Sequence, residues 1–120
     1  YDVAGEALFI GWSQTVRGRE EKALQVFNES VAYWNSLKED GSIDSLDVVF
    51  LAPHGGDLGG FALLKGDAAK LDEVRRSDEF MRQVTRANLI VDGVGVVPAL
   101  TGEALGAQVG LLQQQLGELT

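Results

Sequence analysis

The chain has 120 residues, 45% of them hydrophobic, and a formal net charge of −8. This length predicts one domain, 1–120, with enough apolar residues to form a core without cross-links. The chain has no cysteine, which excludes disulfides, thiolate nucleophiles and cysteine–metal sites and fits a cytoplasmic, reducing location. The acidic balance disfavours nucleic acid and anionic membranes as partners.

Two observations argue against membrane insertion or export. No apolar run approaches the roughly 18 residues that a membrane span needs. The first residues, 1–6, lack the basic and then apolar pattern of a signal peptide. The chain also starts at Tyr1 rather than at Met, which is consistent with a trimmed end.

The apolar pattern predicts the element order β-α-β-β-α-β, followed by one more helix. Short runs rich in branched and aromatic residues indicate strands, and apolar residues three or four positions apart indicate helices. Strands are expected at 7–16, 44–52, 61–66 and 94–100, and helical regions at 19–38, 68–88 and 102–118. The core, 7–100, therefore predicts a ferredoxin-like α+β fold: an antiparallel sheet with helices on one face, plus a C-terminal helix. Pro98 favours an edge position or a bulge for the last strand.

The second helical region carries two start signals. Asp67 precedes the first piece, and Ser77 followed by acidic residues is typical of a second helix cap. We therefore expect two helical pieces or one kinked helix. The residues expected to face the core are Leu71, Val74, Met81, Val84 and Ala87.

The strands are apolar on both faces. Within 44–52, Val48 and Phe50 alternate with Val49 and Leu51, and the other strands show similar patterns. A sheet with helices on one face normally alternates apolar and polar residues along each strand, but these strands do not. The two main helices can cover only one of the two apolar faces. A second copy, the C-terminal helix or a ligand must cover the other face. We expect a homodimer with the two sheets face to face.

The segment 60–67, Gly-Phe-Ala-Leu-Leu-Lys-Gly-Asp, is followed by Leu71 and by 77–80, Ser-Asp-Glu-Phe. Together with the element order and the two-faced strands, it resembles the dimeric α/β-barrel superfamily over residues 7–100. That group includes antibiotic-biosynthesis monooxygenases, stress-responsive barrel proteins, YCII-related proteins and uncharacterised members. The resemblance implies a homodimeric barrel, in some members with a small-molecule pocket between sheet and helices. The activities in the group range from cofactor-free oxygenation and isomerisation to haem chemistry.

The central segment 52–61 contains the only histidine of the chain and four glycines. His54, three residues before Asp57, is a candidate general base oriented by its acid. The pair resembles the His–Asp pair of YCII-related proteins in residue type, not in aligned position. The alternative is a loop histidine and a turn aspartate. The glycines match no phosphate-loop spacing and lie before a strand, which favours a hairpin connection.

Large aromatic side chains suggest a ligand pocket. The candidates are Trp12, Tyr33, Trp34 and Phe61, with ordinary core packing as the alternative. One histidine and no cysteine predict no metal site, and no cofactor is expected. Three functions stay open: a homodimer that binds a small apolar or aromatic molecule, a cofactor-independent oxygenase or isomerase with His54 as base, and a structural or regulatory dimer without a ligand.

Overall fold

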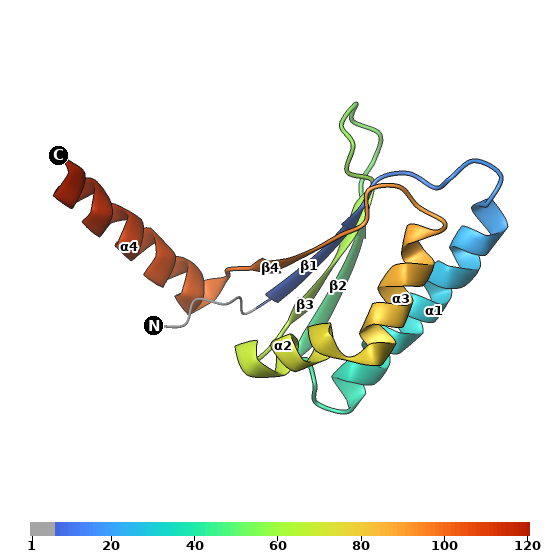
Figure 1. Ribbon diagram of the computed structural model, residues 1–120, viewed down its shortest axis with the longest axis horizontal. Helices are drawn as coiled ribbons and strands as arrows, with labels where there is room; N and C mark the ends of the chain where they lie inside the picture. The colour runs from blue at the N-terminus through green and yellow to red at the C-terminus, as the bar shows by residue number, and fades with distance from the viewer. Residues whose placement is uncertain (1–6) are drawn as a thin grey trace.

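The computed structural model describes residues 7–120 as a four-stranded antiparallel sheet with helices on one face (Figure 1). Residues 1–6, where no signal peptide was expected, lie outside the described residues. The strand order is β2-β3-β1-β4, so β2 and β4 form the edges. The elements are β1 (Ala7–Trp12), α1 (Glu20–Glu39), β2 (Ser45–Phe50), β3 (Gly60–Lys65), α2 (Ala68–Arg76), α3 (Asp78–Asn88), β4 (Gly95–Ala99) and α4 (Gly102–Leu119). The predicted ferredoxin-like fold is confirmed.

The core lies between the sheet and helices α1, α2 and α3. On this face the register pairs Leu8 with Leu64 and Ile10 with Ala62, and all four side chains are buried. The helices contribute Trp34, Leu37, Leu71, Val74 and Phe80 to the same cluster. This cluster is the main hydrophobic core of the domain.

Two side-chain caps divide the second helical region as predicted. The Asp67 carboxylate accepts a hydrogen bond from the backbone N–H of Lys70 at 3.2 Å and starts α2. The Ser77 hydroxyl accepts one from the N–H of Phe80 at 3.2 Å and starts α3. Because Ser77 has an extended backbone, the helical phase restarts at this point.

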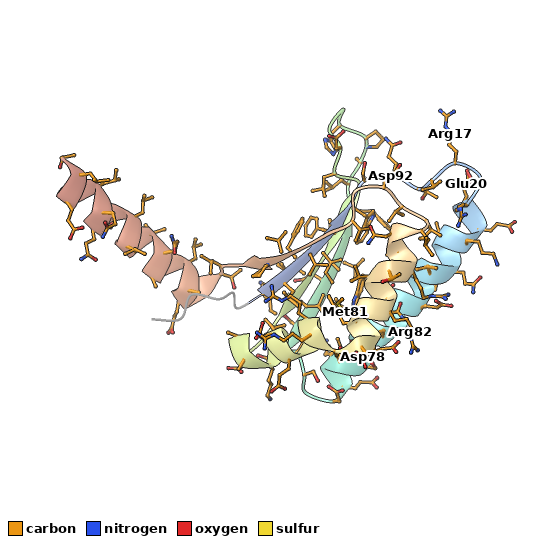
Figure 2. All side chains as sticks on the ribbon, in the orientation of Figure 1. Arg17, Glu20, Asp78, Met81, Arg82 and Asp92 are labelled. Atoms are coloured by element: carbon orange, nitrogen blue, oxygen red, sulfur yellow. The ribbon has the colours of Figure 1, made fainter. Side chains whose placement is uncertain are left out.

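The restarted phase corrects one prediction. Met81 was expected in the core, but this is wrong, because its side chain is 58% exposed (Figure 2). Phe80 takes the inward position instead and is buried. In a single continuous helix from 68 to 88, Met81 would face the core; in the separate helix α3, Phe80 does.

The connection 51–59 joins β2 and β3 as a hairpin, as the sequence predicted. Gly59, the last residue of this connection, and Gly60, the first residue of β3, allow close packing because they have no side chain. A Cβ atom at Gly59 would collide with the carbonyl oxygen of Ser13, and one at Gly60 would lie 2.8 Å from the carbonyl oxygen of Val49 and 2.9 Å from the ring of Trp12. Gly60 therefore leaves the space that the Trp12 indole occupies on the helix-covered face.

The opposite sheet face carries apolar side chains that α1, α2 and α3 do not cover. Phe9 stacks on Phe61 with ring centroids 5.2 Å apart, and the register places Leu63 and Val97 on either side of Phe9. Val97 is 53% exposed. We call these four residues the open face. Its strand β4 is an edge strand, which tolerates Pro98 as the sequence predicted.

The C-terminal helix α4 extends away from the sheet rather than lying on it (Figure 1). Of its side chains, Ala104 is buried, and most others are exposed. Within residues 7–120, no helix combines the length and the apolar character needed to cross a bilayer.

Candidate functional site

A cavity of about 370 Å³ lies between the sheet and helices α1 and α3 and opens to the surface, since its lining includes the exposed side chains of Leu24 and Phe50. Its walls come from β1, β2, α1, α3 and the segments that follow β1 and α3. The side chains that define its character are Trp12, Phe27, Ser30, Trp34, Phe50 and Gln83. The volume falls in the range of about 300–1,000 Å³ that is typical of small-molecule sites.

A backbone ladder that extends β1 borders the cavity. The N–H of Ser13 donates to the carbonyl of Asp92, and the N–H of Asp92 donates to the carbonyl of Gln14, both at 2.8 Å. The N–H of Val16 donates to the carbonyl of Ile90, also at 2.8 Å. β1 was expected to continue to Val16, but the regular strand ends at Trp12, because the chain then pairs with 90–92 instead of β3. This ladder fixes the two chain segments whose residues Ser13, Thr15 and Val91 line the cavity.

An aromatic wall lies at the β1–β2 side of the cavity. The Trp12 ring meets Phe27 edge-on at 6.3 Å and Phe50 edge-on at 6.1 Å, and the rings of Phe27 and Phe50 lie 5.1 Å apart. Edge-to-face pairs of this kind hold their rings in defined orientations. Phe50 is 66% exposed, so the wall reaches the surface and offers flat apolar contact to a ligand.

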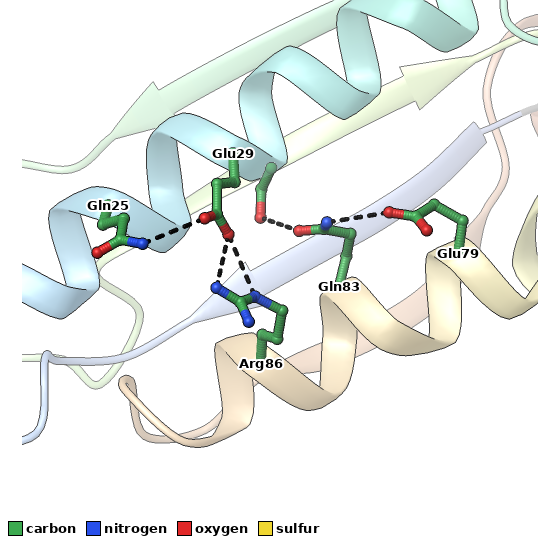
Figure 3. A network of polar contacts seen from close by, with 6 residues as sticks. Gln25, Glu29, Glu79, Gln83 and Arg86 are labelled. Atoms are coloured by element: carbon green, nitrogen blue, oxygen red, sulfur yellow. Dashed lines mark hydrogen bonds and ion pairs between the residues drawn. The ribbon is translucent and has the colours of Figure 1, made fainter.

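A hydrogen-bonded polar pair lies within the largely apolar lining. The Ser30 hydroxyl, 6% exposed as a residue, donates to Gln83 Oε1 at 3.3 Å, and Gln83 Nε2 donates to Glu79 Oε1 at 3.3 Å (Figure 3). The bonds fix the Gln83 amide between α1 and α3. The pair supplies hydrogen-bonding groups inside a largely apolar space.

A charged clamp holds α1 and α3 together beside this pair. The Arg86 guanidinium donates through Nε and an Nη atom to one oxygen of Glu29, at 3.1 and 2.9 Å (Figure 3). Gln25 donates to the other Glu29 oxygen at 3.3 Å. Arg86 is therefore engaged with Glu29, which leaves the cavity walls fixed rather than offering a free cation to a ligand.

The charge at the cavity is negative. Among the described lining residues, Glu20 is the one charged side chain. Backbone hydrogen bonds, from its own N–H and from the N–H of Gly18, hold the pKa of the Glu20 carboxyl below its ordinary value. The Glu20 carboxylate lies at the solvent-exposed edge of the cavity. Within residues 7–120 the structure has no group of three or more His, Asp or Glu side chains placed to hold a metal ion.

Of the aromatic residues proposed for a pocket, the structure brings two together. Trp12 and Trp34 line the cavity. Tyr33 instead packs near the start of α3, with its hydroxyl 3.5 Å from the Ser77 hydroxyl, and burial raises the pKa of its phenol above the ordinary value. Phe61 belongs to the open face on the other side of the sheet.

The proposed pair of His54 and Asp57 lies in the exposed hairpin connection. His54 Nε2 donates to the carbonyl of Leu58 at 2.8 Å, and Nδ1 accepts from the N–H of Gly56 at 3.2 Å. Both ring nitrogens are thus engaged within the loop. In the described part of the chain, the cavity lining includes neither His54 nor Asp57.

Sequence reasoning did not assign Phe50, Ser30 and Gln83 to the pocket. Phe50 sits at the end of a strand with two apolar faces, so its pattern gives no indication of which face it occupies. Ser30 and Gln83 belong to different helices, 53 positions apart. One feature of the sequence could have indicated them: Ser30 and Gln83 are polar residues on the otherwise apolar inward faces of their helices.

Comparison with known proteins shows the fold. No family model and no curated protein matches this sequence. Among solved structures, a hypothetical protein from Arabidopsis thaliana matches with a TM-score of 0.60 at 13% identity, covering 82% of this chain and 89% of its own. A dimeric protein of unknown function and ferredoxin-like fold from Bacteroides fragilis matches with a TM-score of 0.56 at 12% identity, covering 78% and 93%. A point mutant of SnoaB, a cofactor-independent oxygenase from Streptomyces nogalater, matches with a TM-score of 0.53 at 14% identity, covering 79% and 94%.

Proposed function

We propose that this chain is a homodimeric protein that binds a small, uncharged, largely aromatic molecule in the cavity beside the sheet. The observation that carries this proposal is the cavity of about 370 Å³ with its wall of Trp12, Phe27 and Phe50. A flat apolar ligand would replace water against these rings, and the Ser30–Gln83 pair would orient one polar group of the ligand. Apart from Glu20 at the exposed edge, the described lining has no charged side chain, which favours an uncharged ligand.

The homodimer is supported by the open face. Phe9, Phe61, Leu63 and Val97 form an apolar surface on the side of the sheet that α1, α2 and α3 leave uncovered. Surfaces of this kind usually mark an interface. A structural neighbour from Bacteroides fragilis is described as dimeric with a ferredoxin-like fold. Two copies with their open faces together would bury both surfaces in one symmetric contact and close the barrel.

Ligand binding is tested with N-phenyl-1-naphthylamine, a neutral aromatic probe whose fluorescence rises in apolar sites. The variant Ala87→Phe inserts a ring into the cavity from α3, and we expect it to weaken probe binding at least about tenfold. Met81→Phe, at an exposed position of the same helix, is the matched control and should bind like the parent protein. Equal affinities of the two variants would refute the cavity as the site. Absence of probe binding by the parent would favour the structural or regulatory dimer without a ligand.

A second candidate function is cofactor-independent oxygenation or isomerisation of such a ligand. It is favoured by the shared fold of SnoaB, which is described as a cofactor-independent oxygenase. In this proposal His54 is the base and Asp57 orients it, which requires the loop to carry His54 from its bonds with Gly56 and Leu58 to the ligand. The test is oxygen uptake with a polycyclic phenol, in buffer without added metal or flavin. A catalytic base predicts a loss of at least about 100-fold in His54→Gln with unchanged probe affinity.

A further inference from the structure

Among residues 7–120, no other element covers the helix α4 beyond its first turn. It leaves the domain after β4 and extends away from the sheet, and only Ala104, near its start, is buried (Figure 1). The radius of gyration is 16.4 Å, whereas a compact chain of this length has about 14 Å. The extended helix accounts for an elongated shape of 54 × 37 × 21 Å.

This helix carries an apolar stripe and little charge. Leucine and valine side chains recur at helical spacing along one side, and all of them are exposed: Leu105, Val109, Leu112, Leu116 and Leu119. The helix contains three internal glycines, Gly106, Gly110 and Gly117, and a Cβ placed at any of them would meet no heavy atom of another described element within 4 Å. Each glycine lowers the helix–coil equilibrium about fivefold relative to alanine. A helix with this composition needs a surface to pack against.

The charge of α4 indicates which kind of surface the helix packs against. Its charged residues are Glu103 and Glu118, and it has no lysine or arginine. Helices that lie on anionic membranes are typically rich in Lys and Arg, so a lipid surface fits poorly. A second copy of this chain fits better than a lipid surface, because the uncharged stripe matches the charge-depleted core of a contact between two proteins.

The stripe is also continuous with the proposed dimer contact. α4 begins three residues after the end of β4, the edge strand that contributes Val97 to the open face. A second copy seated on the open face therefore lies beside the first turn of α4. We propose that α4 is an arm that docks its apolar stripe on the second copy, so that each copy receives the helix of its partner. This inference rests on the proposed homodimer.

The absence of cysteine gives this proposal a direct test. A single cysteine is introduced as Leu112→Cys on the stripe, or as Gln114→Cys on the opposite side of α4, and labelled with the polarity-sensitive dye acrylodan. Emission is recorded from nanomolar to about 100 µM protein. We expect a blue shift on association for the label at 112 and none for the label at 114.

Sedimentation velocity over the same concentrations measures the strength of the dimer. Leu112→Glu and Gln114→Glu add the same charge to α4, but we expect only Leu112→Glu to weaken the dimer, by at least about 30-fold, since the contact occurs twice in a symmetric pair. Far-UV circular dichroism establishes that both variants retain their helices. Val97→Asp tests separately whether the open face takes part in the dimer contact.

The outcomes distinguish this inference from the proposal on which it rests. A parent protein that sediments at the single-chain mass of 12.9 kDa at 100 µM refutes the homodimer and the arm together. A parent dimer that Val97→Asp dissociates and Leu112→Glu does not, with no shift of the label at 112, refutes the arm and leaves the dimer. Loss of the dimer in Leu112→Glu together with the shift at 112 supports the arm.

Discussion

The two faces of the sheet use similar side chains but differ in what covers them. On the helix-covered face, Leu64 is 0% exposed and packs in the main core. Its neighbour Leu63 points to the open face and stays half-buried beside Phe9. Both are leucines in the middle of β3. Burial here is decided by the layer that lies on each face, not by the hydrophobicity of the residue.

The comparison also separates two roles for the apolar surface. The covered face holds both a packed core and the cavity with its aromatic wall. On the open face, no helix or strand of residues 7–120 lies over the apolar side chains, which suits contact with another chain. The following predictions test this division, from the largest expected effect to the smallest.

The two leucines of β3 should differ most in stability. Leu64→Ala removes a fully buried side chain, and we expect a loss of about 2–5 kcal/mol in the free energy of unfolding. Leu63→Ala, measured by urea denaturation at a protein concentration low enough to favour the single chain, should lose less than about 1 kcal/mol. Similar losses at that concentration would show that the two faces do not differ as described.

The two faces should also differ in probe binding. Trp12→Leu removes a ring from the cavity wall, and we expect the affinity for N-phenyl-1-naphthylamine to fall about tenfold, which is roughly 1.4 kcal/mol. Phe61→Leu is the matched change on the open face and should alter the affinity less than about twofold. Fluorescence titration measures both. A larger effect of Phe61→Leu would move the ligand site to the open face.

The stability of α3, one of the helices that cover the sheet, should depend on the Ser77 cap at its start. Ser77→Ala removes the hydroxyl that accepts from the N–H of Phe80, and we expect a loss of about 1 kcal/mol in the free energy of unfolding. Ser36→Ala, within the exposed side of α1, is the control and should stay within about 0.5 kcal/mol. Urea denaturation measures both. If Ser77→Ala unfolds like the parent protein, the start of α3 does not depend on this cap.

A smaller effect is expected at alkaline pH. Burial raises the pKa of Tyr33 above its ordinary value of 10.0, so folding favours the neutral phenol. The resulting stability is fully present below the unfolded pKa and is lost as the pH rises through the folded pKa. Between about pH 9 and about pH 11, the parent protein should therefore lose more stability than Tyr33→Phe. Equal losses would mean that the phenol is as hydrated in the fold as in the unfolded chain.

Most of the fold was predictable because local signals agreed with it. Short runs rich in branched and aromatic residues located the four strands, and Asp67 and Ser77 marked two helix starts that the structure confirms. Met81 was misplaced because the break at Ser77 shifts the helical phase, and spacing alone does not show such a shift.

The site was less predictable than the fold. Trp12 and Trp34 stood out as large aromatic residues and do line the cavity, but residue type could not separate them from Phe61 on the other face. Ser30 and Gln83 meet only because α1 packs against α3. The roles of His54 and Asp57 stay predictions, and the structure shows the His54 ring bonded to the backbone of its own loop.

The sequence by itself determined which residues form strands and helices, and that both faces of the sheet are apolar, because periodicity and capping are local properties of the chain. Only the tertiary structure decided which face the helices cover, where the cavity lies and that α4 leaves the domain. These features depend on contacts between segments far apart in the chain, and no local pattern contains them. The covered and open faces of β3 show this difference within two consecutive leucines.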